Sequence, residues 1–222
     1  MKRYAIIVAG GQGLRFGAAI PKQFLSVNGR PILFYTLEKF HGIADEIILV
    51  LPESHQEYWK ELCDKESFRI PVTIITGGDS RTQSVMNGLS AINGNGIVAI
   101  HDAVRPFVSK QLLNQLYQVA TEKGNAVPVI AMPESIRFRD VNSNYSVNRT
   151  DYAIVQTPQC FNLQLIKKAY HNIGSGIFTD DASVLENSGE AVYLVEGETY
   201  NIKVTYREDI LYAEALLKSS IL

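Results

Sequence analysis

Short apolar runs alternate along the first part of the chain with stretches in which apolar residues recur every three or four positions. The runs are nearly continuous, which is typical of strands covered on both faces. Between them, Leu33, Leu37 and Phe40 show the i, i+4, i+7 spacing of one helix face. Strands separated by helices indicate βαβ units and a parallel sheet with right-handed crossovers. The predicted strands are 4–9, 46–51, 71–76, 96–100 and 126–130.

The same spacing predicts further helices, and polar residues mark where some of them begin. Ser80-Arg81-Thr82-Gln83 has the pattern of a capping box. Thr179, followed by two acidic residues, is expected to cap another helix and to suit its dipole. A strand is predicted at 192–195. The predicted helices are 33–40, 54–64, 80–92, 112–119, 163–169, 180–187 and 208–217.

The pattern changes at Met132-Pro133. Polar and apolar residues alternate over 135–139 and 145–149, and turn-forming residues fill 140–144. This predicts a β-hairpin arm, residues 133–151, projecting from a single domain that spans 1–222. A lone hairpin is marginally stable in water. We therefore expect the arm to rest on a second subunit of a homodimer.

Composition excludes several classes of protein. The 222 residues suit one large domain, and the net charge of −2 does not suggest a nucleic-acid binder. No stretch reaches the roughly 18 apolar residues that a membrane span needs. The two cysteines, Cys63 and Cys160, lack metal-ligand spacing. We expect a reduced, cytoplasmic protein without nucleic-acid or membrane partners.

A glycine-rich loop follows the first predicted strand, over residues 9–16. Nearby glycines let backbone N–H groups approach an anion, and ligands of parallel sheets bind at the carboxyl ends of strands. Phe16 stands where a dinucleotide-binding loop requires a third small residue, which argues against an NAD-linked oxidoreductase. The chain contains no Gly-Lys dipeptide, so the loop is not a Walker motif either.

Two cations flank this loop. Arg15 closes it, and Lys22 follows in Pro21-Lys22-Gln23. An arginine and a lysine placed in this way can neutralise a triphosphate from two sides. The alternative is a tight turn with two solvated charges.

The loop together with Pro-Lys-Gln-Phe, residues 21–24, resembles the signature of the sugar-phosphate nucleotidyltransferase family, and specifically its cytidylyltransferase branch. The resemblance runs from about residue 4 to residue 217 over six ordered blocks. It implies a Rossmann-like α/β fold with a mostly parallel sheet flanked by helices. It also implies Mg²⁺-assisted transfer of the cytidylyl group of CTP to 2-C-methyl-D-erythritol 4-phosphate, a step of non-mevalonate isoprenoid synthesis.

The resemblance implies a CTP site built at the ends of several strands. Arg15 and Lys22 would stabilise charge on the α-phosphate, and the Gly78–Ser84 block would read the cytosine. Asp79 and Ser80 could instead only cap a helix. The implied CTP-binding residues are Ala9, Gly10, Gly11, Gly13, Gly78, Asp79, Ser84, Asp102 and Ala103.

The acceptor site is implied by later blocks. Arg149, at the end of the arm, and Lys203, in a predicted apolar strand, would hold the acceptor phosphate. Their alternatives are a solvated hairpin charge and an edge-strand charge. Asp102 and Arg105 could simply be a local ion pair. The implied acceptor-binding residues are Asp102, Arg105, Ser135, Arg149, Thr157, Thr179 and Lys203; no protein side chain is assigned to the metal, which CTP phosphates would carry.

This chemistry needs no general base, because a phosphomonoester with a second pKa of about 6 is already ionised near neutral pH. The catalyst must instead offset repulsion between two anions and orient them. Arg15, Lys22, Arg149 and Lys203 are the expected catalytic cations. Two alternatives stay open: ribitol 5-phosphate as the acceptor, and a catalytically silent nucleotide-sensing module.

Overall fold

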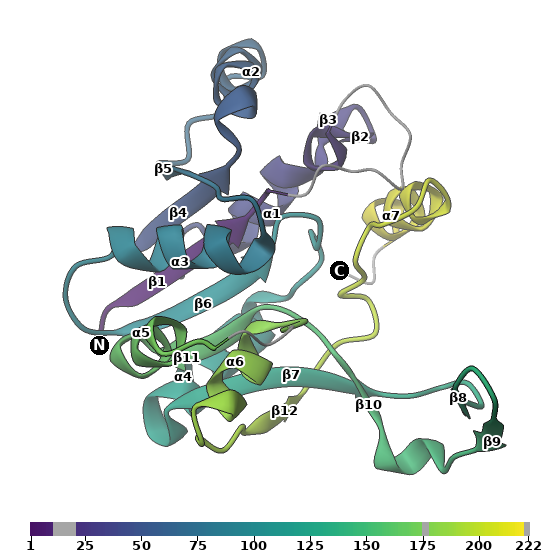
Figure 1. Ribbon diagram of the computed structural model, residues 1–222. Helices are drawn as coiled ribbons and strands as arrows, with labels where there is room; N and C mark the ends of the chain where they lie inside the picture. Colours follow the sequence, from purple (N-terminus) through teal and green to yellow (C-terminus); the bar gives the residue numbers. More distant parts are fainter. Residues whose placement is uncertain (11–20, 175–177, 220–222) are drawn as a thin grey trace.

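The computed structural model describes residues 1–10, 21–174 and 178–219. Its centre is a sheet in the order β10-β7-β11-β6-β1-β4-β5, with β12 also paired to β7 (Figure 1). The pairs of β1 with β4 and β6, of β4 with β5, and of β7 with β12 are parallel. These strands are β1 (Arg3–Val8), β4 (Glu46–Leu51), β5 (Thr73–Thr76), β6 (Ile97–Asp102), β7 (Asn125–Ala131) and β12 (Leu194–Glu196). The predicted α/β fold with a mostly parallel sheet is confirmed.

Two strands of the central sheet were not predicted from the sequence. The strand β11 (Gln159–Asn162) lies antiparallel between β6 and β7, and β10 (Ala153–Val155) pairs antiparallel with β7. Both are short, and β11 begins and ends with polar residues, so neither shows a recognisable apolar run. Gln159 is nevertheless fully buried, because its side chain bonds Asp180 and the amide of Ala182.

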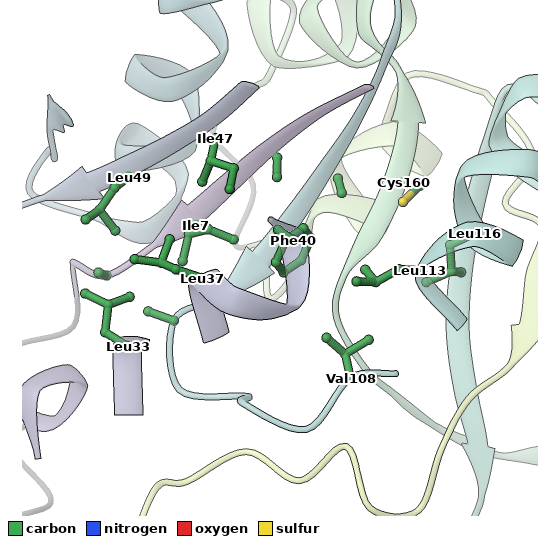
Figure 2. Packing of buried hydrophobic residues seen from close by; sticks show 14 of the residues in the cluster. Ile7, Leu33, Leu37, Phe40, Ile47, Leu49, Val108, Leu113, Leu116 and Cys160 are labelled. Atoms are coloured by element: carbon green, nitrogen blue, oxygen red, sulfur yellow. The ribbon is translucent and has the colours of Figure 1, made fainter. Parts of the chain in front are cut away.

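Helices cover both faces of the sheet, because the central strands present mainly apolar side chains on both sides. One cluster joins Ile7 and Leu49 to helix α1 (Ile32–Phe40), helix α2 (Glu53–Lys65) and helix α4 (Lys110–Lys123) (Figure 2). The other face packs against α3 (Arg81–Ala91), α5 (Leu163–His171) and α6 (Asp181–Asn187). Both layers together fix the strand ends at which the cleft described below opens.

A third cluster attaches the last helix, α7 (Glu208–Lys218). Val204 and Ala213 are fully buried there with Val27 and Phe107. Val27 belongs to a small ribbon of β2 (Ser26–Val27) and β3 (Arg30–Pro31) that follows the turn η1 (Lys22–Phe24). This cluster holds the segment before α7 against the carboxyl end of the sheet.

The predicted arm is present, with shorter strands than expected. Its strands β8 (Arg137–Arg139) and β9 (Asn144–Ser146) pair antiparallel, and the turn η2 (Arg149–Asp151) leads back to β10. The arm extends away from the sheet in Figure 1. Phe138 and Tyr145 stack at 4.9 Å between ring centroids while each remains about half exposed, at 46% and 54%.

Three local predictions need correction. Asp180, not Thr179, caps α6, by accepting a hydrogen bond from the Ser183 amide. Ser80 caps α3, but the Gln83 side chain bonds Asn87 and leaves the capping box half formed. Lys203 lies in no strand: the chain is irregular between β12 and α7, because its amides bond side chains and loops instead of a neighbouring strand.

Among the residues that the structure describes, no helix is long and apolar enough to cross a membrane. Cys63 and Cys160 are free thiols, and burial raises the pKa of the Cys63 thiol to about 11.

Candidate active site

A cleft of about 1180 Å³ opens at the carboxyl ends of β1, β4, β5 and β6. This is where ligands of parallel sheets bind, because the loops that leave neighbouring strands meet there. The start of α2, the turn η1 and the segment before α7 complete its walls. Its lining includes Ala9, Gly10, Lys22, Gln23, Gly78, Asp79, Arg81, Ser84, Asp102, Ala103 and Lys203.

The turn η1 brings Lys22 to this cleft. The Gln23 amide nitrogen donates to the Ala9 carbonyl at 2.8 Å, which joins the turn to the end of β1. Ala9, Gly10 and Lys22 therefore lie together, as the sequence predicts. Gly11, Gly13 and Arg15 lie outside the described residues.

The loop after β5 is shaped by Ser84. Its hydroxyl accepts from the Gly78 amide at 3.1 Å and donates to the Ser80 carbonyl at 2.8 Å. A Cβ at Gly10 or Gly77 would lie only 3.2 Å from this oxygen, so two backbone segments converge on one side chain. The only hydroxyl proton of Ser84 is already donated within the loop, so this side chain holds the loop in shape. Towards a nucleotide base in the cleft, the hydroxyl could still accept a hydrogen bond through its remaining lone pair.

Asp102 is the carboxylate at the centre of the cleft's charges. Lys203 Nζ lies 2.8 Å from Oδ2, Arg105 Nε lies 3.5 Å from the same oxygen, and Arg81 Nε lies 3.7 Å from Oδ1. Burial alone would raise the pKa of Asp102, but these cations hold it well below its usual range. The carboxylate is ionised at every physiological pH, and the cluster carries an excess of positive charge.

Arg81 is a functional candidate that the sequence did not single out. Its two terminal nitrogens bond both oxygens of Asp181, at 3.0 and 2.7 Å, and Asp181 is fully buried and also bonded by Tyr170 at 2.6 Å. Because this fork fixes the guanidinium plane, Arg81 presents a preorganised positive charge to the cleft. An arginine at the first position of a helix gives no local sign of such a partner.

Thr157 and His101 lie beneath Asp102. The Thr157 hydroxyl accepts from the Asp102 amide at 3.1 Å and lies 3.1 Å from His101 Nδ1. His101 Nε2 is 3.0 Å from the Arg105 carbonyl, which can only accept, so Nε2 carries the proton and Nδ1 accepts from Thr157. Thr157 thus supports the strand end that carries Asp102, with its hydroxyl already engaged.

His101 predicts a pH dependence of stability. Burial lowers the pKa of His101 from 6.5 to about 4. The unfolded chain therefore binds this proton more tightly between these values, and stability should fall as pH drops from about 6.5 to 4, by up to about 1.4 kcal/mol per unit. Urea unfolding of His101→Gln should show a shallower pH slope than the wild type. The exposed His171→Gln serves as control, and an unchanged slope in His101→Gln would contradict the assignment.

Ser135, Arg149 and Thr179 lie away from the cleft. Ser135 and Arg149 are exposed on the arm, where Arg149 donates to the Pro133 carbonyl at 2.5 Å. Thr179 is exposed before α6, and Asp79 is exposed at the cleft itself. The single chain therefore gathers Lys22, Asp102, Arg105 and Lys203, but not the two arm residues.

The donor set for a metal is sparse. The part of the chain that the structure describes holds no group of three or more His, Cys, Asp or Glu side chains placed to bind a metal ion. Asp102 offers one carboxylate among cations. This fits magnesium only in the form that uses one or two carboxylates together with substrate phosphates.

A cleft at the carboxyl ends of parallel strands, with glycines in its wall and cations around the Asp102 carboxylate, suits an enzyme that binds a nucleotide, and the comparison with known families identifies the class as nucleotidyltransferase. Residues 4–219 match the family model IspD, 2-C-methyl-D-erythritol 4-phosphate cytidylyltransferase. The chain belongs to this family.

Individual relatives and solved structures support the same family assignment. The 2-C-methyl-D-erythritol 4-phosphate cytidylyltransferase of Bacteroides fragilis is 48% identical over 219 residues, covering 98% of this chain and 100% of the relative. The crystal structure of 4-diphosphocytidyl-2C-methyl-D-erythritol synthase from Anaerococcus prevotii has a TM-score of 0.85 at 30% identity, covering 98% of this chain and 96% of the other. The Thermus thermophilus cytidylyltransferase structure gives 0.80 at 31% identity, covering 99% and 100%.

Proposed function

We propose that this protein transfers the cytidylyl group of CTP to 2-C-methyl-D-erythritol 4-phosphate, releasing pyrophosphate and forming 4-diphosphocytidyl-2-C-methyl-D-erythritol. Membership of the family supports the reaction and both substrates. The observation that carries the proposal is the Asp102 cluster, in which three cations surround one carboxylate at the cleft. Such a site suits a reaction between two anions.

The reaction is a displacement at the α-phosphate. A phosphate oxygen of the acceptor forms the new P–O bond, and the bond to pyrophosphate breaks in line. The nucleophile is already ionised, so no side chain has to remove a proton. Lys22, with Arg15, offsets the charge that builds on the α-phosphate, and Lys203 holds the acceptor phosphate.

Lys203 forms an ion pair with Asp102 that still leaves its ammonium accessible to a phosphate. Its ammonium lies 2.8 Å from Asp102, yet 41% of its side chain is exposed. A phosphate entering the cleft can therefore bond the remaining ammonium protons, since the group has three donors. Arg105 is less free, because it also donates to the Asn201 carbonyl at 2.8 Å.

Mg²⁺ is part of the proposal as an ion that enters with CTP. When bound, it would screen the triphosphate oxygens and orient the leaving pyrophosphate. Asp102 is the side chain that would face it.

The proposal includes a cytoplasmic location, where nucleoside triphosphates are present.

We also propose that the arm completes the acceptor site of a second copy. Arg149 and Ser135 lie on the arm, which projects away from the sheet (Figure 1), and residues of the arm do not line the cleft of their own chain. The exposed Phe138–Tyr145 pair gives the arm an apolar surface to bury. The proposed assembly is a homodimer, and sedimentation of a monomer at micromolar protein would remove its basis.

Arg149→Ala should weaken acceptor binding far more than CTP binding. Removing one charged hydrogen-bond donor to a phosphate costs about 1.5–3 kcal/mol, so we expect the acceptor KM to rise about 10- to 100-fold. Steady-state kinetics with each substrate varied in turn would measure this. Arg139→Ala, an exposed arginine on the same arm, is the matched control. An unchanged acceptor KM in Arg149→Ala would refute the role of the arm.

Pyrophosphate release tests the proposed function directly. The protein is given CTP and Mg²⁺ with 2-C-methyl-D-erythritol 4-phosphate or with ribitol 5-phosphate, in separate reactions. Release with the former alone is the expected result. Release with ribitol 5-phosphate alone would keep the mechanism and change the acceptor. CTP binding without release in either reaction would identify a nucleotide-sensing module.

A further inference from the structure

Lys203 lies in a stretch without regular structure, yet its ammonium has to be placed accurately. The strand β12 ends at Glu196 and α7 begins at Glu208, so no helix or sheet ladder positions the intervening chain. Lysine also has large rotamer freedom. Something other than secondary structure must hold the backbone near Lys203.

Gln156 makes the first contacts that fix this segment. Its amide nitrogen donates to the Glu198 carbonyl at 2.8 Å, and its amide oxygen accepts from the Glu198 N–H at 3.1 Å. The side chain thus replaces a neighbouring strand for this residue. Gln156 is buried, and a Cβ at Gly197 would lie 2.5 Å from its amide oxygen, so only glycine allows the approach.

Asn201 supplies the second hold, two residues before Lys203. It is fully buried, and its side-chain nitrogen donates to the Thr157 carbonyl at 2.9 Å. Its own carbonyl accepts from Arg105 at 2.8 Å. Beyond Lys203, the Val204 amide donates to the Val104 carbonyl at 2.9 Å, which closes the segment.

The dipeptide Gln156-Thr157 therefore contacts the segments that carry both members of the Asp102–Lys203 ion pair. Gln156 and the Thr157 carbonyl hold the segment that carries Lys203, while the Thr157 hydroxyl accepts from the Asp102 amide. Asp102 and Lys203 come from distant parts of the chain, and Gln156-Thr157 sets their separation.

One feature of Asn201 is hard to explain by stability alone. Its side-chain oxygen is buried, and no described residue forms a hydrogen bond with it. Leaving a buried acceptor unpaired costs free energy, and native structures contain few such atoms.

We propose that Gln156 and Asn201 are positioning residues for Lys203, which fix the backbone of residues 197–204 so that the lysine ammonium meets the acceptor phosphate. The inference rests on the proposed function, and it assigns these two amides no contact with either substrate. Their contribution is to geometry.

Asn201→Ala should raise the acceptor KM and lower kcat, each by about 10- to 100-fold, because a displacement of about 1 Å at a reacting group can cost that much. The dissociation constant of CTP, measured by calorimetry without acceptor, should change less than about threefold. Equal losses for both substrates would overturn the proposal. Should Asn201→Ala fail to fold, Gln156→Met, similar in length, carries the same expectation.

Asn125→Ala is the matched control. Asn125 is also fully buried and bonds backbone through both amide atoms, to the Ala191 carbonyl and the Tyr193 amide, each at 2.8 Å, but it does not line the cleft. Its replacement should lower the melting temperature and leave the ratio of acceptor KM to CTP affinity unchanged. If Asn125→Ala shifts that ratio as much as Asn201→Ala, general destabilisation explains the effect.

Two further readouts separate this proposal from the proposed function. In a Lys203→Ala background, Asn201→Ala should add less than about twofold, because residues that act through one group are not additive. Hydrogen exchange without substrates should be faster over 197–204 in Asn201→Ala. Faster exchange would support the positioning role even if the wild type transferred nothing, and unchanged exchange would overturn it.

Discussion

Lys22→Ala should lower kcat for cytidylyl transfer by about 100-fold or more while the fold stays intact. Lys22 reaches the cleft from η1, beside Ala9 and Gly10. Its charge offsets the negative charge that develops on the α-phosphate, and losing one preorganised donor of this kind costs roughly 10²- to 10³-fold in kcat. Pyrophosphate release at saturating substrates would measure the loss.

The matched control for this experiment is Lys65→Ala. Lys65 is at the end of α2, and 77% of its side chain is exposed. It should leave kcat unchanged within about twofold, because exposed surface charges contribute little. If Lys22→Ala retained turnover within about threefold of the wild type, the cation would not act on the reacting phosphate. Circular dichroism of both variants would establish that they fold.

Asp181→Ala should lower the free energy of unfolding by about 3 kcal/mol, at the low end of the range for breaking a buried ion pair. Asp181 is fully buried, and its loss leaves Arg81 without its bidentate partner and Tyr170 without an acceptor. The Arg81 side chain remains 31% exposed, so water relieves part of the cost. Urea unfolding of both proteins at neutral pH would give the difference.

Two comparisons show what the pair contributes. Asn162→Ala removes the cap of α5 and should cost only about 1 kcal/mol. The double replacement Arg81→Met with Asp181→Leu removes both charges and should recover part of the stability that Asp181→Ala loses. A loss below about 1 kcal/mol in Asp181→Ala would mean that the ion pair is not what holds α3 to α6.

The sequence shows where anions can bind because that information is local. Glycines after a buried strand, with a following Pro-Lys-Gln, mark a strand end whose backbone can approach phosphate. Lys22 and Gly10 lie in the cleft for this reason. Asp102 follows from the same logic, since it is the last residue of β6.

The partners of these residues were not visible in the sequence. The sequence predicted only that Asp181 lies in the first turn of a helix. In the structure it is buried and bonds Arg81, 100 positions earlier in the chain. Lys203 read as part of a strand, yet it lies in an irregular segment held by Gln156 and Asn201. Neither pairing has a periodicity, because a side chain from one loop can meet any other that the sheet brings to the same edge.

The sequence by itself therefore determined the main parallel strands, the helix faces and the glycine-lined strand ends, because these depend on hydrophobic period and backbone freedom within a few residues. The tertiary structure alone decided which charges meet. The physical reason is that an ion pair requires two side chains within about 4 Å, and only the folded chain, through helix packing for Arg81 and Asp181 and through loop contacts for Lys203, brings these charges to that range.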